Sequence, residues 1–263
     1  MGLRREAVNA VAAGAARYRV CAPVMIPEGE LPVGNLVDFG SFGLRHAEDS
    51  LIAKLVSYGA QPALSVDFDR AAQTFWKYHE KAGLLSWDDA EGPVWDEEAD
   101  FERLDALKAR FHDWFLFDYR LMNGMRVVEA FGKEHLPCLN RFELQLLTYW
   151  LDSYYGVFRI RLEPDRLTLE DVLSGDAFHV TLDLEELSPE GTLMAGRPLS
   201  LGEEARLSGA VVTVVPSMAE SVTGELVRKY ERLRSFSPNL TVVQFYRLCG
   251  HMLDSLLEDG VLH

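Results

Sequence analysis

The chain has 263 residues, of which 48% are hydrophobic and 25% charged, and its formal net charge is −15. This composition is typical of a globular protein, and a chain of this length buries enough surface to fold without a structural metal or a disulfide. Non-specific binding to polyphosphates or anionic membranes requires a basic face, which an acidic balance disfavours. The composition therefore argues against nucleic acid and membranes as partners.

The three cysteines, Cys21, Cys138 and Cys249, are more than a hundred residues apart and form no CxxC pair. This spacing predicts ordinary thiols in a reducing compartment rather than a zinc site or a disulfide framework. The first twenty residues lack the continuous apolar core of a signal peptide, and no stretch is long and apolar enough to span a membrane. We therefore expect a cytoplasmic protein with no metal and no cofactor.

Residues 1–100 are predicted to form a mostly helical N-terminal region. Prolines and glycines are concentrated over 22–43, which predicts a loop, and helical spacing returns over Ser50–Tyr58 and Asp69–Gly83. The acidic stretch 86–100 lacks the alternating acids of a calcium loop, so it is predicted to be a solvated loop that also supplies acids to the next helix N-terminus.

Residues 101–263 are predicted to form an α+β domain that starts with two helices. Apolar residues from Phe101 to Phe115 recur at intervals of three and four, which is typical of a buried helical stripe. Asn140 followed by Glu143 has the spacing of a capping box at the start of a second helix, which ends before Gly156.

The hydrophobic period changes from about 3.6 to 2 at Gly156, which marks the start of a β-module at about 157–216. Alternation predicts strands over Phe158–Leu162 and Phe178–Leu184, and shorter apolar runs predict strands over Leu167–Leu169, Thr192–Leu199 and Leu207–Val215. Five short strands predict a small antiparallel barrel-like or meander module. C-terminal helices follow over 217–263, predicted at Met218–Arg234 and Asn239–Asp259.

Two groups of residues are candidates for a functional site. His112 and Asp113 lie beside Asp118 and Arg120, but neighbours on a helix point about 100° apart, so a surface-facing pair is favoured over a catalytic dyad. Arg159, Arg161 and His179 occupy polar faces of two predicted strands and could together bind a phosphate or a carboxylate. Salt bridges to nearby acids such as Asp183 are the favoured alternative. Five of these residues form the candidate binding set: Asp118, Arg120, Arg159, Arg161 and His179.

Four segments carry a resemblance to a known family: WFLFDYRL (Trp114–Leu121), Glu143 in its capped helix, YGVFRI (Tyr155–Ile160) and LEDVLSGDAFHV (Leu169–Val180). Over about 105–216 the chain resembles a family of uncharacterised bacterial and archaeal proteins, many of which also carry a SEC-C zinc knuckle. The closely spaced cysteines of that knuckle are absent here. The resemblance therefore implies a fold, but neither zinc binding nor catalytic residues.

Three functions remain open, and the first is favoured. The chain is predicted to be a non-enzymatic protein-interaction module, because it has no catalytic motif and because its two acidic segments, 61–110 (12 acids, 6 bases) and 164–216 (10 acids, 3 bases), would attract a basic partner. The alternatives are an enzyme whose site is assembled from distant residues, and RNA or single-strand binding through an OB-like module. The Leu-rich C-terminal helix is compatible with a homodimer interface, although a core helix would have the same pattern.

Overall fold

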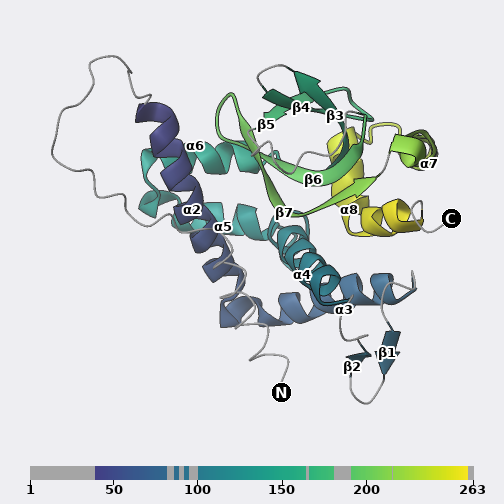
Figure 1. Ribbon diagram of the computed structural model, residues 1–263. Coiled ribbons are helices and arrows are strands. Elements are labelled where there is room, and N and C mark those ends of the chain that lie inside the picture. Colours follow the sequence, from purple (N-terminus) through teal and green to yellow (C-terminus); the bar gives the residue numbers. More distant parts are fainter. Residues whose placement is uncertain are drawn as a thin grey trace.

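The computed structural model describes residues 39–81, 86–88, 92–94, 100–163, 166–180, 191–214 and 216–259 (Figure 1). Helices precede and follow a closed five-stranded barrel, so the α+β prediction is confirmed. The predicted opening helix and the loop residues before Phe39 lie outside the described residues, as do residues 181–190 between two strands of the barrel.

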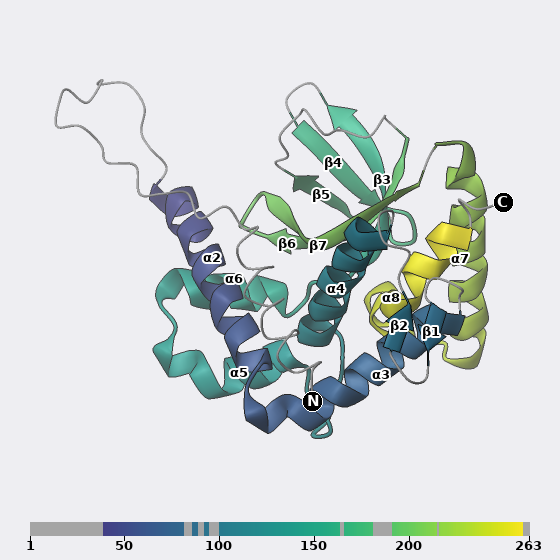
Figure 2. The ribbon, with the colours of Figure 1, turned by 60° about the horizontal axis from the view of Figure 1, so that its bottom comes forward.

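The N-terminal half is a layer of helices. It comprises α2 (Phe39–Gly59), η1 (Pro62–Leu64), α3 (Ser65–Lys81), α4 (Asp100–Phe117), α5 (Val127–His135), η2 (Leu136–Cys138) and α6 (Arg141–Trp150). Helices α2, α5 and α6 lie together on one side, and α4 runs beneath the barrel against strand β7 (Figures 1 and 2). Their facing side chains form a first hydrophobic cluster, which includes Leu51, Phe75, Phe115, Phe131 and Trp150.

Two predictions about the first hundred residues are corrected. Helix α2 begins at Phe39, so part of the predicted loop is helical. Gly43 faces α6, and a Cβ atom there would lie 2.8 Å from the Phe142 ring, so glycine permits this close approach of the two helices. The acidic stretch, predicted to be a loop, contains a two-stranded hairpin formed by β1 (Ser86–Asp88) and β2 (Gly92–Val94).

The barrel consists of β3 (Gly156–Glu163), β4 (Arg166–Asp171), β5 (Ala177–Val180), β6 (Leu193–Ser200) and β7 (Ala205–Val214). The period-2 pattern holds, because cross-strand rows such as Ile160–Leu169–Phe178 alternate with rows such as Arg161–Thr168–His179. The strands occupy the predicted part of the chain, so the predicted β-module is confirmed.

The order of the strands differs from a meander. They close in the order β3-β4-β5-β7-β6, with β3 paired to β6, so the chain crosses from β5 to β6 without pairing those two strands. The contact between β5 and β7 is parallel, through Val180 and Ala205, so the barrel is mixed rather than purely antiparallel. A five-stranded Greek-key barrel of this kind is the architecture that OB folds use.

Helices α7 (Pro216–Phe236) and α8 (Val242–Asp259) follow the last strand and lie on the side of the barrel opposite α2 (Figure 2). Tyr246 of α8 stacks on Tyr154 with ring centroids 5.4 Å apart, and the Tyr154 hydroxyl donates to Asp171 Oδ2 at 2.9 Å. These contacts attach α8 to the barrel. Among the described helices, none has the length and apolar content needed to cross a membrane.

The apolar side chains form two clusters, and the boundary between their main sequence ranges lies near residue 151. The first contains residues from Leu44 to Trp150 together with Leu199 and Leu201, and the second contains residues from Tyr154 to Leu253. Helices on both sides of residue 100 contribute side chains to the first cluster.

Candidate functional site

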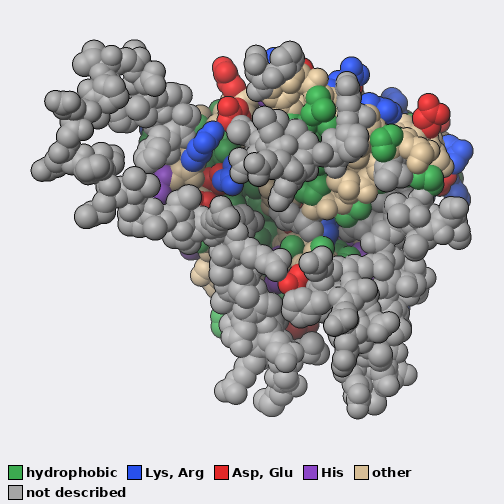
Figure 3. Space-filling view, viewed as in Figure 1, with side chains coloured by type: hydrophobic (Ala, Val, Ile, Leu, Met, Phe, Trp, Pro, Cys, Tyr) green, Lys and Arg blue, Asp and Glu red, His purple; other side chains and the backbone are tan. Residues whose placement is uncertain are grey.

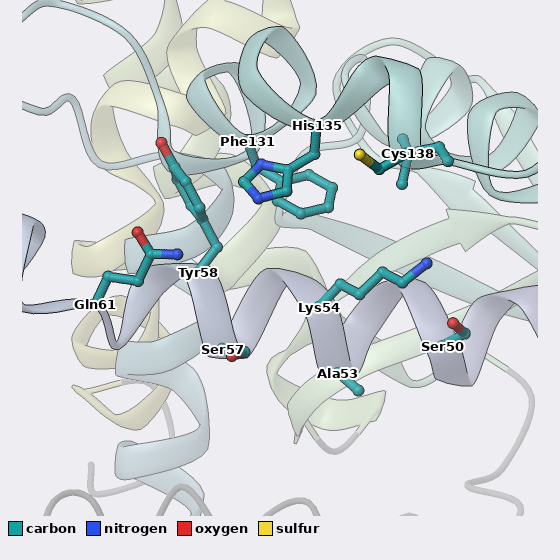
Figure 4. A pocket seen from close by; sticks show the side chains of 10 residues that line it. Ser50, Ala53, Lys54, Ser57, Tyr58, Gln61, Phe131, His135 and Cys138 are labelled. Atoms are coloured by element: carbon teal, nitrogen blue, oxygen red, sulfur yellow. The ribbon is translucent and has the colours of Figure 1, made fainter.

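A groove lies between α2 and the α5–η2 segment (Figure 4). Its volume is about 460 Å³, within the range of roughly 300–1,000 Å³ that is typical of ligand pockets. It is lined by side chains from α2 and the turn after it, from α5, and from the α5–α6 connection: Ser50, Ala53, Lys54, Ser57, Tyr58, Gln61, Phe131, His135, Cys138 and Leu139.

Helix periodicity explains why these residues share one face. The lining positions of α2 recur at intervals of three and four, so they form a stripe along the helix. A second stripe, with Leu44, Leu51 and Leu55, is buried in the first hydrophobic cluster. Helix α2 is therefore held by one face and presents the other to the groove.

An aromatic corner, defined as Tyr58, Phe131 and His135, forms one end of the groove. The Phe131 and His135 rings, one turn apart on α5, stack with centroids 4.8 Å apart and an interplanar angle of 11°. The Tyr58 ring meets both edge-on, with centroids 5.3 Å from His135 and 5.6 Å from Phe131. Edge-to-face and stacked arrangements of this kind are the favourable geometries of aromatic pairs.

The Tyr58 hydroxyl and His135 Nδ1, two polar atoms of the aromatic corner, differ in their hydrogen bonding. Burial, together with a hydrogen bond to Glu134, raises the pKa of Tyr58 to about 12, so its hydroxyl stays protonated near neutral pH. His135 Nδ1 is buried and has no hydrogen-bond partner among the described residues. A buried polar atom without a partner costs free energy, and its burial keeps this nitrogen out of contact with the groove.

The charge at the other end of the groove is compensated. Lys54 Nζ lies 2.5 Å from Glu143 Oε1, which also accepts a hydrogen bond from Ser50 Oγ at 2.7 Å. The other carboxylate oxygen accepts from the Asn140 backbone N–H at 3.0 Å, and Asn140 caps α6 in return, so the predicted capping box is confirmed. One buried carboxylate thus joins α2 to the start of α6 and neutralises the ammonium group of the groove.

The Glu143→Gln variant is expected to lower the free energy of unfolding by about 1–2 kcal/mol, because it weakens charge-assisted hydrogen bonds of a buried group. Burial alone would raise the pKa of Glu143, but the hydrogen bonds from Lys54, Ser50 and Asn140 together hold it below the ordinary value of 4.5. A lowered folded-state pKa contributes stability above the unfolded-state value and loses it as the pH falls. Urea unfolding should therefore show a deficit that is constant above about pH 4.5 and shrinks in more acidic buffer.

The matched control is Glu204→Gln, which removes one charge from an exposed pair with Arg45 at 3.4 Å. Exposed pairs contribute little, so this variant should stay within about 0.5 kcal/mol of the wild type. Equal stability of the two variants, or a Glu143→Gln deficit that grows as the pH falls, would show that Glu143 does not stabilise the groove through its charge.

A buried network of charged side chains, which we call the Arg197 network, connects the helical layer to the barrel. Arg197 of β6 is fully buried and donates from Nε to Asp113 Oδ2 of α4 at 3.0 Å, and its Nη2 pairs with Asp118. Asp113 also accepts from Ser208 of β7 at 2.8 Å. Two carboxylates from the end of α4 thus meet one guanidinium group from the barrel.

Three further arginines extend this network to α8 and α6. Arg110 lies over the Tyr155 ring, 3.0 Å from its centroid, and donates to the Gly250 carbonyl at 3.0 Å. Arg126 and Arg247 both donate to the Leu151 carbonyl at 2.8 Å. The segment between the two hydrophobic clusters is therefore fixed by arginine side chains from both halves of the chain.

The candidate residues Asp118 and Arg120 lie in different places. Asp118 is buried in the Arg197 network, where burial raises the pKa of its carboxyl although Arg197 opposes this shift. Arg120 is exposed and donates to the Gly124 carbonyl at 2.7 Å, within a tight turn. Asp118 is thus engaged with Arg197, and Arg120 with a carbonyl of its own turn.

Arg159, Arg161 and His179 do share one face of the barrel. Adjacent pairs in the strand register place Arg161, Thr168 and His179 in one row, and Arg159 occupies the neighbouring row. Arg161 pairs with Glu170, and a His179 ring nitrogen lies 3.1 Å from Thr168 Oγ1. Figure 3 shows basic and acidic side chains interspersed over the barrel. The pairing with Glu170 compensates the charge of Arg161. The predicted salt-bridge partner Asp183 lies outside the described residues.

The prediction that His112 and Asp113 form a surface-facing pair is wrong. Asp113 is buried and paired with Arg197, whereas the His112 ring packs beside Phe68 and Phe111. Burial lowers the pKa of His112 to about 4. The two side chains diverge, as their adjacent positions on a helix require.

Sequence reasoning missed both Arg197 and the groove. Arg197 interrupts an otherwise apolar strand, and this pattern could have suggested a buried ion pair, because a buried charge requires a partner. The pair Phe131 and His135 has the four-residue spacing that places side chains over one another, but nothing in the sequence indicates which helix faces them.

Within the described part of the chain, no three His, Cys, Asp or Glu side chains are arranged to hold a metal ion. Comparison of the sequence with protein-family models, and of the chain with curated proteins and with solved structures, found no match.

Proposed function

We propose that this protein is a non-enzymatic interaction module that binds a segment of a partner protein in the groove between α2 and the α5–η2 segment. The observation that carries this proposal is the groove itself, an open concavity of about 460 Å³ whose aromatic and polar lining is typical of a recognition site. Exposed apolar surface continues beside it at Leu136, whose exposed fraction is 52%.

The rest of the fold supports this role by holding the groove in place. Helix α2 is attached to the first hydrophobic cluster by one face and to α6 through Glu143, so the groove is built on regular helices rather than on a loop. Preorganised surfaces bind more tightly because less conformational freedom is lost on binding. The chain's net charge of −15 favours the approach of a basic partner at long range.

The proposal is tested by affinity purification of the tagged protein from its own host, with and without nuclease treatment, followed by quantitative mass spectrometry. The wild type is compared with Ser57→Arg, which places a long charged side chain at an exposed groove position, and with Gln73→Arg at an exposed position of α3 outside the groove. We expect Ser57→Arg to reduce recovery of a partner protein at least tenfold, with Gln73→Arg at the wild-type level.

Thermal unfolding of both variants verifies that the fold is intact. A partner that Ser57→Arg recovers at the wild-type level would overturn the assignment to the groove. Recovery that depends on nucleic acid would overturn the proposal as a whole and favour single-strand binding by the Greek-key barrel.

A further inference from the structure

The last two turns of α7 carry an apolar face that leaves the core. Along the first part of the helix this face is buried, with Val222 and Leu226 in the second hydrophobic cluster. The same intervals of three and four residues continue from Leu226 through Lys229 and Leu233 to Phe236. At this end the face is open to solvent, because Leu233 is 38% exposed and Phe236 is 80% exposed. The stripe that attaches α7 to the barrel therefore extends beyond the barrel.

The exposed end of α7 is held in place by its neighbours. The Tyr230 ring meets Phe245 of α8 edge-on, with ring centroids 5.3 Å apart, and the Tyr230 hydroxyl donates to the Leu240 carbonyl at 3.2 Å. Phe236 follows less than two turns later on the same helix. It is therefore presented on a regular, anchored element, which limits the conformational freedom lost on binding.

The shape of this surface indicates the shape of its complement. Phe236 has the largest exposed fraction of the exposed large hydrophobic side chains in the described part of the chain. Leu233 lies one turn before it on the same face, so the two side chains form one apolar patch on the convex surface of a helix end. A protruding aromatic side chain is buried only by a concave surface, so the complement is an apolar pocket in another molecule.

The charges beside the patch indicate the charge around that pocket. Lys229 and Arg232 are exposed on the same face, and neither forms an ion pair among the described residues. Glu225, one turn earlier, is already paired with Arg228 at 2.6 Å. Residues 228–241 contain four basic residues and one acidic residue, although the whole chain carries a net charge of −15. Charges act over only about 8 Å at physiological ionic strength, so this local excess favours carboxylates on the facing surface.

We infer that the end of α7 is a second docking surface, which inserts Phe236 into an apolar pocket with an acidic rim on another protein. We call this surface the α7 anchor and define it as Lys229, Arg232, Leu233 and Phe236. Helix α7 lies on the side of the barrel opposite α2, so the α7 anchor is separate from the groove (Figure 2). Aromatic side chains that fill a pocket often dominate the binding energy of an interface, whereas exposed charges around it orient and accelerate association.

Photocrosslinking from position 236 identifies the protein that the α7 anchor contacts. A benzophenone derivative of phenylalanine replaces Phe236, which keeps an aromatic ring at this position, and the full chain is irradiated in its host. We expect a major adduct with another protein from position 236 and none from position 73, where Gln73 is exposed on α3. The crosslinked residues of that protein should line an apolar pocket with Asp or Glu at its rim.

Titration of the purified crosslinked protein with the full chain measures the two contributions. Phe236→Ala should weaken binding at least about tenfold, whereas Leu248→Ala, at an exposed apolar position of α8, should bind like the wild type. Arg232→Glu should weaken binding about tenfold at low salt and have little effect at about 1 M salt, where charges act over only about 3 Å. Arg234→Glu makes the same charge change on the opposite face of α7 and is its control.

Thermal unfolding verifies that these surface variants remain folded. Absence of an adduct from position 236, or equal binding of Phe236→Ala and Leu248→Ala, would overturn the α7 anchor. Equal losses for Arg232→Glu and Arg234→Glu would overturn the acidic rim. Adducts only with a second copy of this chain, or only with nucleic acid, would overturn the assignment to another protein. Ser57→Arg should leave this binding unchanged, so the α7 anchor and the groove are tested independently.

Discussion

Replacing Arg197 by Met is expected to lower the free energy of unfolding by about 3–5 kcal/mol, the usual cost of leaving a buried charge without its partner. The guanidinium group is fully buried and compensates both Asp113 and Asp118, whose side chains are 2% and 0% exposed. Methionine retains much of the side-chain volume but leaves two carboxylates in an apolar environment. Unfolding curves in guanidinium chloride at pH 7 measure the change in the free energy of unfolding.

The dependence of this deficit on pH is a second readout. Burial already raises the pKa of Asp118, and removal of Arg197 would raise it further, so the folded variant binds protons more readily than the unfolded chain. Stability of the variant should therefore fall as the pH rises, and its deficit should shrink in acid. The additional substitutions Asp113→Asn and Asp118→Asn should recover part of the loss at pH 7.

The matched control for this variant is Arg161→Met, which removes an exposed arginine paired with Glu170 on the same barrel. It should change stability by less than about 1 kcal/mol. If Arg197→Met were no more destabilising than Arg161→Met, the Arg197 network would not hold the barrel on the helices.

Replacing Trp150 by Ala is expected to lower the free energy of unfolding by about 3–5 kcal/mol, because it removes a large side chain from a packed core and leaves a cavity. Trp150 is fully buried at the end of α6, against Phe117, and its Nε1 donates to the Ser200 carbonyl of β6 at 3.2 Å. The substitution therefore removes both packing and a direct link between the helical layer and the barrel. Thermal or denaturant unfolding measures the loss.

Trp150→Phe separates the two contributions, because it retains most of the packing and removes the indole N–H. Trp150→Phe should lower the free energy of unfolding by less than Trp150→Ala does. Tyr149→Ala is the control one residue earlier, where the side chain is 40% exposed. A Trp150→Ala protein no less stable than Tyr149→Ala would contradict the assigned role of Trp150 in joining the two halves.

Local periodicity predicted the elements of this fold well. The change of period at Gly156 located the barrel, and Asn140 with Glu143 located the start of α6, because these signals depend on neighbours in sequence. The order of the strands could not be predicted in the same way. The pairing of β3 with β6 and the parallel contact of Val180 with Ala205 join residues far apart in the chain, and alternation specifies which face is buried but not which strand lies alongside.

The candidate site was predicted less completely, for a physical reason. The alternation of Arg159, Arg161 and His179 correctly placed them on polar faces of neighbouring strands, since face is a local property. The groove instead forms where α2 and α5 approach each other, and these two helices are separated in sequence by α3 and α4. The roles of Tyr58 and His135 depend on that tertiary contact, which no spacing within either helix encodes.

Site-specific photocrosslinking tests the proposed binding role of the groove most directly. A benzophenone amino acid replaces Ala53, which lines the groove, or Gln73, which is exposed elsewhere on the helical layer, and the protein is irradiated in its host. The proposal predicts a covalent adduct with a partner protein from position 53 and none from position 73. Adducts from position 73 with none from position 53 would contradict it.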